Sequence, residues 1–171
     1  MQQQRIQPHL QPTCHSFIEL SPMTFDVTTL SRGDVIFAIP PPINDAAVPI
    51  TKTKGGKIGK HPIIVFAVDA PAKTVQGAMV QSFNNATTLD ESGLKPEQYF
   101  WFLPVTPAVK ESIHNPVSAR PGTAGKHEWI NLKDVLTITE DKVKKQLDGK
   151  ISPTALTEIE NAIKKAHAHV K

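Results

Sequence analysis

Fifteen prolines are spread along this chain of 171 residues, which has only nine glycines. A proline has no backbone N–H and a fixed φ, so it ends a helix and is confined in a sheet to edges and strand starts. A helix bundle is therefore excluded, and the triple proline at 40–42 must end any element before it. The length suits one domain with a sizeable core and is too short for two ordinary ones.

Five apolar segments have the character of β-strands. Asp34–Ile39 precedes the triple proline, His61–Val68 is a nearly continuous apolar run that should be buried on both faces, and Gly77–Phe83 follows a turn. Tyr99–Val105 is expected to be a strand covered on both sides, although its aromatic rings could also form a stacking platform for bases. Glu128–Leu132 resumes the strand pattern after a loop. These segments predict a small antiparallel sheet or barrel.

The C-terminal part changes to a helical pattern. Thr139 can cap a helix that runs from Glu140 to Asp148, with Gly149 at the position that follows a helix. Ser152 can cap a second helix, whose apolar stripe is formed by Leu156, Ile159, Ile163 and Ala166. The sequence thus predicts two short C-terminal helices that pack on the sheet. At the other end, residues 1–30 are rich in Gln and Pro and are expected to form a flexible leader.

The positive charge is concentrated in one segment. The formal net charge is +3, and Thr51–His61 holds Lys52, Lys54, Lys57 and Lys60 without any acid. Mobile lysines in a glycine-containing loop can neutralise the phosphates of a nucleic acid, and the alternative is an ordinary solvated loop.

Other features exclude several classes of protein. No apolar run approaches the length of a membrane span, and the lone Cys14 can form no internal disulfide, so a cytoplasmic protein is expected. The seven histidines are scattered, and the closest pair, His167 and His169, would point to different faces of a helix. Neither a metal ion nor another cofactor is therefore expected. Asp34, Asp69 and Glu128 are candidate acid–base carboxylates, but no spacing singles them out.

The order of these segments is itself a pattern, carried by Arg32–Ile36, Gly59–Val65, Met79–Val80 and Asp134–Thr139, with Lys142–Ala166 after them. This series resembles the MazF/PemK family of toxin endoribonucleases over about residues 31–167, with an enlarged region at 84–127. The resemblance implies one domain over 31–171 with a small SH3-like or CcdB-like β-barrel and C-terminal helices. It also implies a homodimer, a single-stranded RNA substrate cleaved without a metal, and an antitoxin-like protein partner.

The resemblance departs from the family at the catalytic positions. The family has an arginine before the proline of the second strand and a threonine that closes the third; here these positions hold His61 and Asn84, or its neighbour Ser82. If cleavage is retained, His61 serves as acid or base, Asn84 orients the scissile phosphate, and Lys57 or Lys60 replaces the arginine.

Further phosphate contacts are then expected from Arg32, Lys52 and Lys54. Arg120, in the enlarged region, could restore a guanidinium group. The alternative is a catalytically silent barrel of the same fold that binds RNA or a protein, since an asparagine cannot replace a hydroxyl in proton transfer.

Overall fold

The structure, a computed structural model, describes residues 25–43, 59–118 and 125–170. These residues form an antiparallel sheet and one α-helix, so the described part of the protein is mainly β, as predicted. The elements are η1 (Val27–Thr29), β1 (Asp34–Ala38), β2 (His61–Asp69), β3 (Thr74–Gln81), η2 (Phe83–Asn85), η3 (Pro96–Trp101), β4 (Phe102–Val105), β5 (Glu128–Asn131), β6 (Leu136–Thr139), η4 (Glu140–Lys142), β7 (Val143–Lys150) and α1 (Pro153–His169), where η denotes a 3-10 helix.

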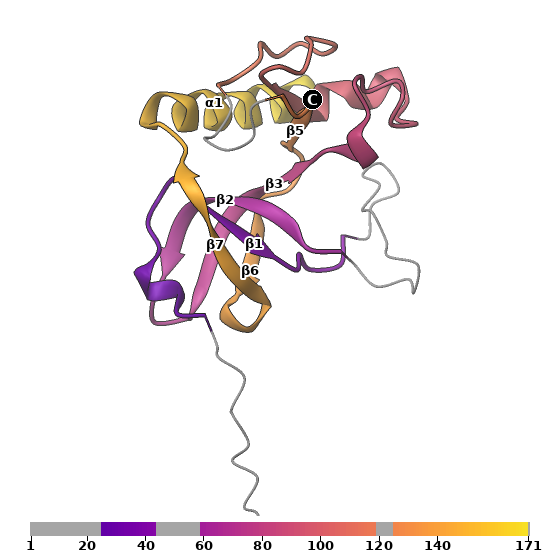
Figure 1. The fold of residues 1–171 in the computed structure, drawn as a ribbon. Coiled ribbons are helices and arrows are strands. Elements are labelled where there is room, and N and C mark those ends of the chain that lie inside the picture. The colour runs from indigo at the N-terminus through magenta and orange to yellow at the C-terminus, as the bar shows by residue number, and fades with distance from the viewer. Residues whose placement is uncertain (1–24, 44–58, 119–124, 171) are drawn as a thin grey trace, which may run out of the picture.

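The short connection between β6 and β7 constrains the shape of the sheet. Its strand order is β4-β5-β3-β2-β1-β7, and β6 pairs with the first half of β3 while β5 pairs with its end. Strands β6 and β7 lie beside β3 and β1 respectively, yet only the three residues of η4 join them. The sheet must therefore bend so that these two strands approach each other, and Figure 1 shows the strands crossing in a strongly twisted arrangement.

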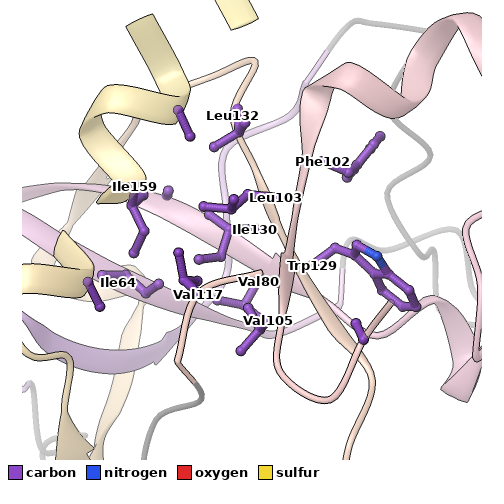
Figure 2. Packing of buried hydrophobic residues seen from close by; sticks show 14 of the residues in the cluster. Ile64, Val80, Phe102, Leu103, Val105, Val117, Trp129, Ile130, Leu132 and Ile159 are labelled. Carbon is purple, nitrogen blue, oxygen red and sulfur yellow. The ribbon is translucent and has the colours of Figure 1, made fainter. Parts of the chain in front are cut away.

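Alternate residues of the central strands face two separate hydrophobic clusters, as a sheet covered on both faces requires. Val35, Ile64 and Val80 belong to the first cluster, which also contains β4, β5 and α1 residues. Figure 2 shows Ile159 of α1 directed at this cluster. The second cluster draws residues from β1, β2, β3, β6 and β7 and comprises Val27, Leu30, Ile36, Ala38, Ile63, Val65, Val75, Met79, Leu136, Ile138 and Val143.

The helix predicted after Ser152 is confirmed. The Ser152 side chain accepts a hydrogen bond from the backbone N–H of Ala155 at 3.2 Å, which caps α1. The predicted stripe faces the protein: Leu156, Ile159 and Ala166 are buried and Ile163 is half-buried. In Figure 1, α1 lies across one end of the curved sheet.

The helix predicted from Glu140 to Asp148 is wrong, so there is one C-terminal helix and not two. This segment forms η4 and then β7, which pairs with β1. Val143 and Leu147 are four residues apart, but an irregularity in the register of β7 at Lys144 separates them. Val143 is buried in the second cluster, and Leu147 packs against the first. Gly149 has φ of +83° and lies in a bulge of β7 rather than after a helix.

Two of the other strand predictions are only partly correct. Strand β2 is buried on both faces from Ile63 to Val65, but its later residues alternate between half-buried and exposed. In Tyr99–Val105 the first three residues belong to η3, and only Phe102–Val105 is a strand. All four residues of β4 are buried, so the prediction of a doubly covered strand holds for that part.

The backbone of Gly33, which precedes β1, forms hydrogen bonds with two segments that are distant in the sequence. Its N–H donates to the Val65 carbonyl at 2.8 Å, and its own carbonyl accepts from the N–H of Ile151 at 2.9 Å. Its φ of +92° and the 2.9 Å that would separate an added Cβ from the Ile151 oxygen both require glycine.

Residues 25–30, which precede β1, are packed against the sheet. Residues 1–24 lie outside the described residues, but η1 follows at Val27–Thr29 and is capped by Asp26. Val27 and Leu30 are buried in the second cluster. The packed part of the chain therefore begins before residue 31, the predicted start of the domain. Over residues 25–43, 59–118 and 125–170, no helix combines the length and the apolar character that crossing a membrane requires.

Candidate functional site

A pocket of about 470 Å³ opens on the face of the sheet that carries the first cluster. Phe37 of β1 is paired with Lys145 of β7 on one side and with Pro62 of β2 on the other, and all three residues line the pocket. Val80 continues this row on β3. Paired residues on neighbouring strands point to the same face, so strand pairing alone assembles the floor. Phe37 is half-buried and thus offers part of its ring to the pocket.

The charges around the pocket are mainly positive. Lys60 precedes β2, Lys126 precedes β5, and Lys145 belongs to β7; all three are exposed and line the pocket. Glu128, the first residue of β5, also lines it but is only 7% exposed. Three ammonium groups from distant parts of the sequence therefore converge on one hollow that also contains a buried carboxylate.

His61 lines the pocket at the start of β2 and is 9% exposed. Its Nε2 is buried and has no hydrogen-bond partner among the described residues. Burial lowers the pKa of His61 below its usual value, and a hydrogen bond with the backbone of Val80 offsets only part of this effect. The imidazole is therefore neutral at pH 7.

Asn84 lies on a strained turn at the pocket. Phe83, Asn84 and Asn85 have φ values of 43°, 59° and 66°, and Phe83, Asn84 and the preceding Ser82 line the pocket. Left-handed φ is uncommon for residues other than glycine, and it is a true outlier for a bulky side chain such as phenylalanine. Three such residues in succession mark a backbone held under strain, a condition that clusters at functional sites. The Phe83 ring secures the turn by packing on Phe102 and Trp129 at centroid distances of 5.3 and 5.6 Å.

The structure thus brings together three of the predicted site residues, His61, Asn84 and Lys60. Arg32 is not among the residues lining this pocket, and its guanidinium forms an ion pair with Glu160 of α1 at 2.7 Å. Lys52, Lys54, Lys57 and Arg120 lie outside the described residues.

Sequence reasoning missed Phe37, Lys126 and Lys145. Lys145 was missed because residues 140–148 were predicted to form a helix. In the strand that forms instead, Lys145 and Leu147 are two residues apart and share a face, and both line the pocket. Glu128 is one of the three carboxylates that the sequence offers as acid–base candidates, and no spacing distinguishes it from Asp34 and Asp69. No local signal connects residue 37 with residue 145, since only the pairing of β1 with β7 does so.

The aromatic run at 99–105 is mainly a packing feature. Phe102 is fully buried and Trp101 is 8% exposed. Phe100 and Trp101 contact each other at 4.6 Å between ring centroids, and they pack against His169 and His167 of α1 at 5.0 and 5.1 Å. These rings therefore attach the end of α1 to η3, and they do not line the pocket described above.

No group of three or more His, Cys, Asp or Glu side chains in the described ranges is arranged to hold a metal ion. No protein-family model and no curated protein matches this chain.

Proposed function

We propose that this protein is a MazF/PemK-like, SH3-like barrel that binds single-stranded RNA in the pocket formed by β1, β2, β3, β5 and β7. The observation that carries the proposal is the convergence of Lys60, Lys126 and Lys145 around the half-buried ring of Phe37. Lysines neutralise backbone phosphates and release counterions, while an aromatic ring stacks on an unpaired base.

Two features of the fold support the barrel. The three residues of η4 join the end of β6 to the start of β7, and both strands contribute to the second cluster along with β1, β2 and β3. A curved sheet that encloses its own apolar side chains is the arrangement expected for a small barrel.

The pocket supports RNA binding more strongly than it supports catalysis. His61 Nε2 is buried, so it reaches a ribose 2′-OH only after the atoms above it move. Cleavage is nevertheless a second candidate, favoured by the neutral imidazole and by the strained turn at Asn84. In that reaction Nε2 accepts the 2′-OH proton and the 2′-oxygen attacks phosphorus. The 5′-oxygen leaves with a proton from an ammonium group, and a 2′,3′-cyclic phosphate remains.

Two adjacent lysines of β7 test the binding proposal. Lys145 lines the pocket, whereas Lys144 does not, and its Nζ donates to the Asp141 carbonyl at 2.9 Å. We expect Lys145→Ser to weaken binding of a fluorescein-labelled single-stranded RNA and to lower the slope of log K against log salt by about 0.7. Lys144→Ser is the control and should match the wild type. Equal slopes for all three proteins would remove the pocket from the binding site.

The same RNA, incubated in EDTA and separated on a sequencing gel, tests cleavage. Discrete products that disappear in His61→Ala would support His61 as the base. Binding without cleavage by the wild type would leave the silent RNA-binding barrel.

A further inference from the structure

The backbone changes hand in the turn that follows β3. Ser82 has φ of −111° and ψ of 0°, close to the right-handed helical region, whereas the next residue, Phe83, has φ of 43° and is left-handed. Asn84 and Asn85 are left-handed too, so η2 does not continue as a right-handed helix. Where a right-handed residue precedes a left-handed one, successive backbone N–H groups point into one concavity, which is called a nest. In this turn those groups belong to Ser82, Phe83 and Asn84.

These three N–H groups are available to a ligand. The hydrogen bonds of the turn use the next two N–H groups, since Asn85 donates to the Ser82 carbonyl at 2.9 Å and Ala86 to the Phe83 carbonyl at 3.2 Å. The N–H groups of Ser82, Phe83 and Asn84 have no acceptor among the described residues. All three residues line the pocket, and Ser82 and Phe83 are half-buried. Because backbone N–H groups in a folded protein are almost always paired, three successive donors of this kind indicate a place where water or a ligand supplies the acceptor.

The side chains around this turn favour an anion. The pocket is also lined by three exposed lysines, Lys60, Lys126 and Lys145. Glu128 adds one negative charge, but it has an interaction partner within the protein and the lysines outnumber it. His61 is a separate indication of a ligand, because it lines the same pocket, is 9% exposed and has a buried Nε2 without a partner among the described residues. A buried polar atom without a partner costs free energy, which a ligand in the pocket would recover.

We propose that the backbone of Ser82, Phe83 and Asn84 forms a nest that binds a phosphate group. The inference rests on the proposed function and deepens it, because the phosphate belongs to the bound RNA. The oxygens of a phosphate group accept several hydrogen bonds at once, so three convergent donors beside ammonium groups match its chemistry. Asn84 thus contacts the phosphate through its backbone N–H rather than through its side-chain amide.

Nuclear magnetic resonance of isotopically labelled protein tests the nest directly, since each backbone amide gives its own signal. In phosphate-free buffer, addition of inorganic phosphate should move the amide proton signals of Ser82, Phe83 and Asn84 to lower field along one shared binding curve, because a hydrogen bond to an anion deshields the proton. Sodium chloride at the same ionic strength is the control and should leave these signals in place. Signals that stay in place with phosphate, or that move equally with sodium chloride, would overturn the nest.

Two substitutions of Asn84 separate its backbone from its side chain. Glycine adopts a positive φ freely, so Asn84→Gly removes the side-chain amide and keeps the turn, whereas the β-branched side chain in Asn84→Val opposes the left-handed conformation. We expect Asn84→Gly to bind inorganic phosphate about tenfold more tightly than Asn84→Val. Equal binding by the two variants would overturn the nest, because the conformation of the backbone would then not matter. If Asn84→Val does not fold, the titration of the wild type still decides.

Lys73→Val is the matched control for a valine at a left-handed position. Lys73 has φ of 52° but lies in the turn between β2 and β3, and it does not line the pocket. This variant should bind inorganic phosphate as the wild type does. Weakening equal to that of Asn84→Val would show that the loss comes from general destabilisation, and it would overturn the assignment to Ser82, Phe83 and Asn84.

The nest and RNA binding can fail separately. If labelled single-stranded RNA binds but inorganic phosphate leaves the three amide signals in place, the nest is overturned while the RNA-binding proposal stands. If inorganic phosphate moves the signals but no RNA binds, the proposed function fails, and the nest stands as a site for a different phosphate compound.

Discussion

Burial lowers the pKa of two histidines in this protein, His61 and His114. His61 lies at the pocket, and His114 is 3% exposed, with its Nε2 donating to the Phe100 carbonyl at 2.8 Å. Burial is the main cause that lowers the pKa of each imidazole, and the backbone hydrogen bonds offset it only in part. For His114, the positive charges of Lys165 and His169 on α1 act in the same direction as burial.

These lowered pKa values make stability depend on pH. In the unfolded chain both imidazoles take up a proton near their ordinary value of 6.5, whereas in the folded protein they do so only at lower pH. The stabilisation is therefore complete above pH 6.5 and is lost as the pH falls towards the folded-state values. We expect urea denaturation between pH 7.5 and pH 5 to show this decline, with a slope of up to about 1.4 kcal/mol per pH unit for each histidine. His61→Gln and His114→Gln should each make the free energy of unfolding decline less steeply as the pH falls. If both variants kept the slope of the wild type, the buried histidines would not be the cause of the decline.

At the scale of the element, the two C-terminal segments show which patterns a sequence leaves ambiguous. The stripe of α1 uses spacings of three and four, and a spacing of three would place side chains on opposite faces of a strand, so only a helix fits. In 140–148 there are only two apolar residues, Val143 and Leu147, and one spacing is too little to establish either period. Pairing with β1 decided between them, because β1 would otherwise leave its backbone groups on that edge without partners. Thr139, predicted as a cap, bonds instead to the Asp141 carboxylate.

At the scale of the whole molecule, the first cluster ties α1 to the sheet and to the enlarged region. It includes Ile64 of β2, Leu103 of β4, Ile130 of β5 and Ile159 of α1. Ile159 is 1% exposed, so its removal leaves a cavity at the point where these elements meet (Figure 2). A cluster with contributions from so many elements indicates that helix and sheet unfold as one unit.

Ile159→Ala should accordingly lower the free energy of unfolding by about 2–5 kcal/mol. The control is Val135→Ala, since Val135 is 47% exposed and its truncation should change stability by less than about 0.5 kcal/mol. Helix content by far-ultraviolet circular dichroism and burial of Trp101 and Trp129 by fluorescence should give one coincident transition in urea. A helix transition that precedes the tryptophan transition would show that α1 is a separate folding unit.

The amino-acid sequence by itself determined those elements whose pattern of apolar and capping residues is compatible with a strand or with a helix, but not with both. The strands that begin at Asp34, His61 and Glu128 and the helix after Ser152 follow from local propensity, capping and periodicity, which act between neighbours in the chain. The pocket depends on pairing between strands far apart in the sequence. Phe37, Glu128 and Lys145 become neighbours only through β1, β5 and β7, and the left-handed turn at Asn84 is held by the rings around Phe83. Tertiary structure alone decided these features, because no short-range interaction connects the residues that form them.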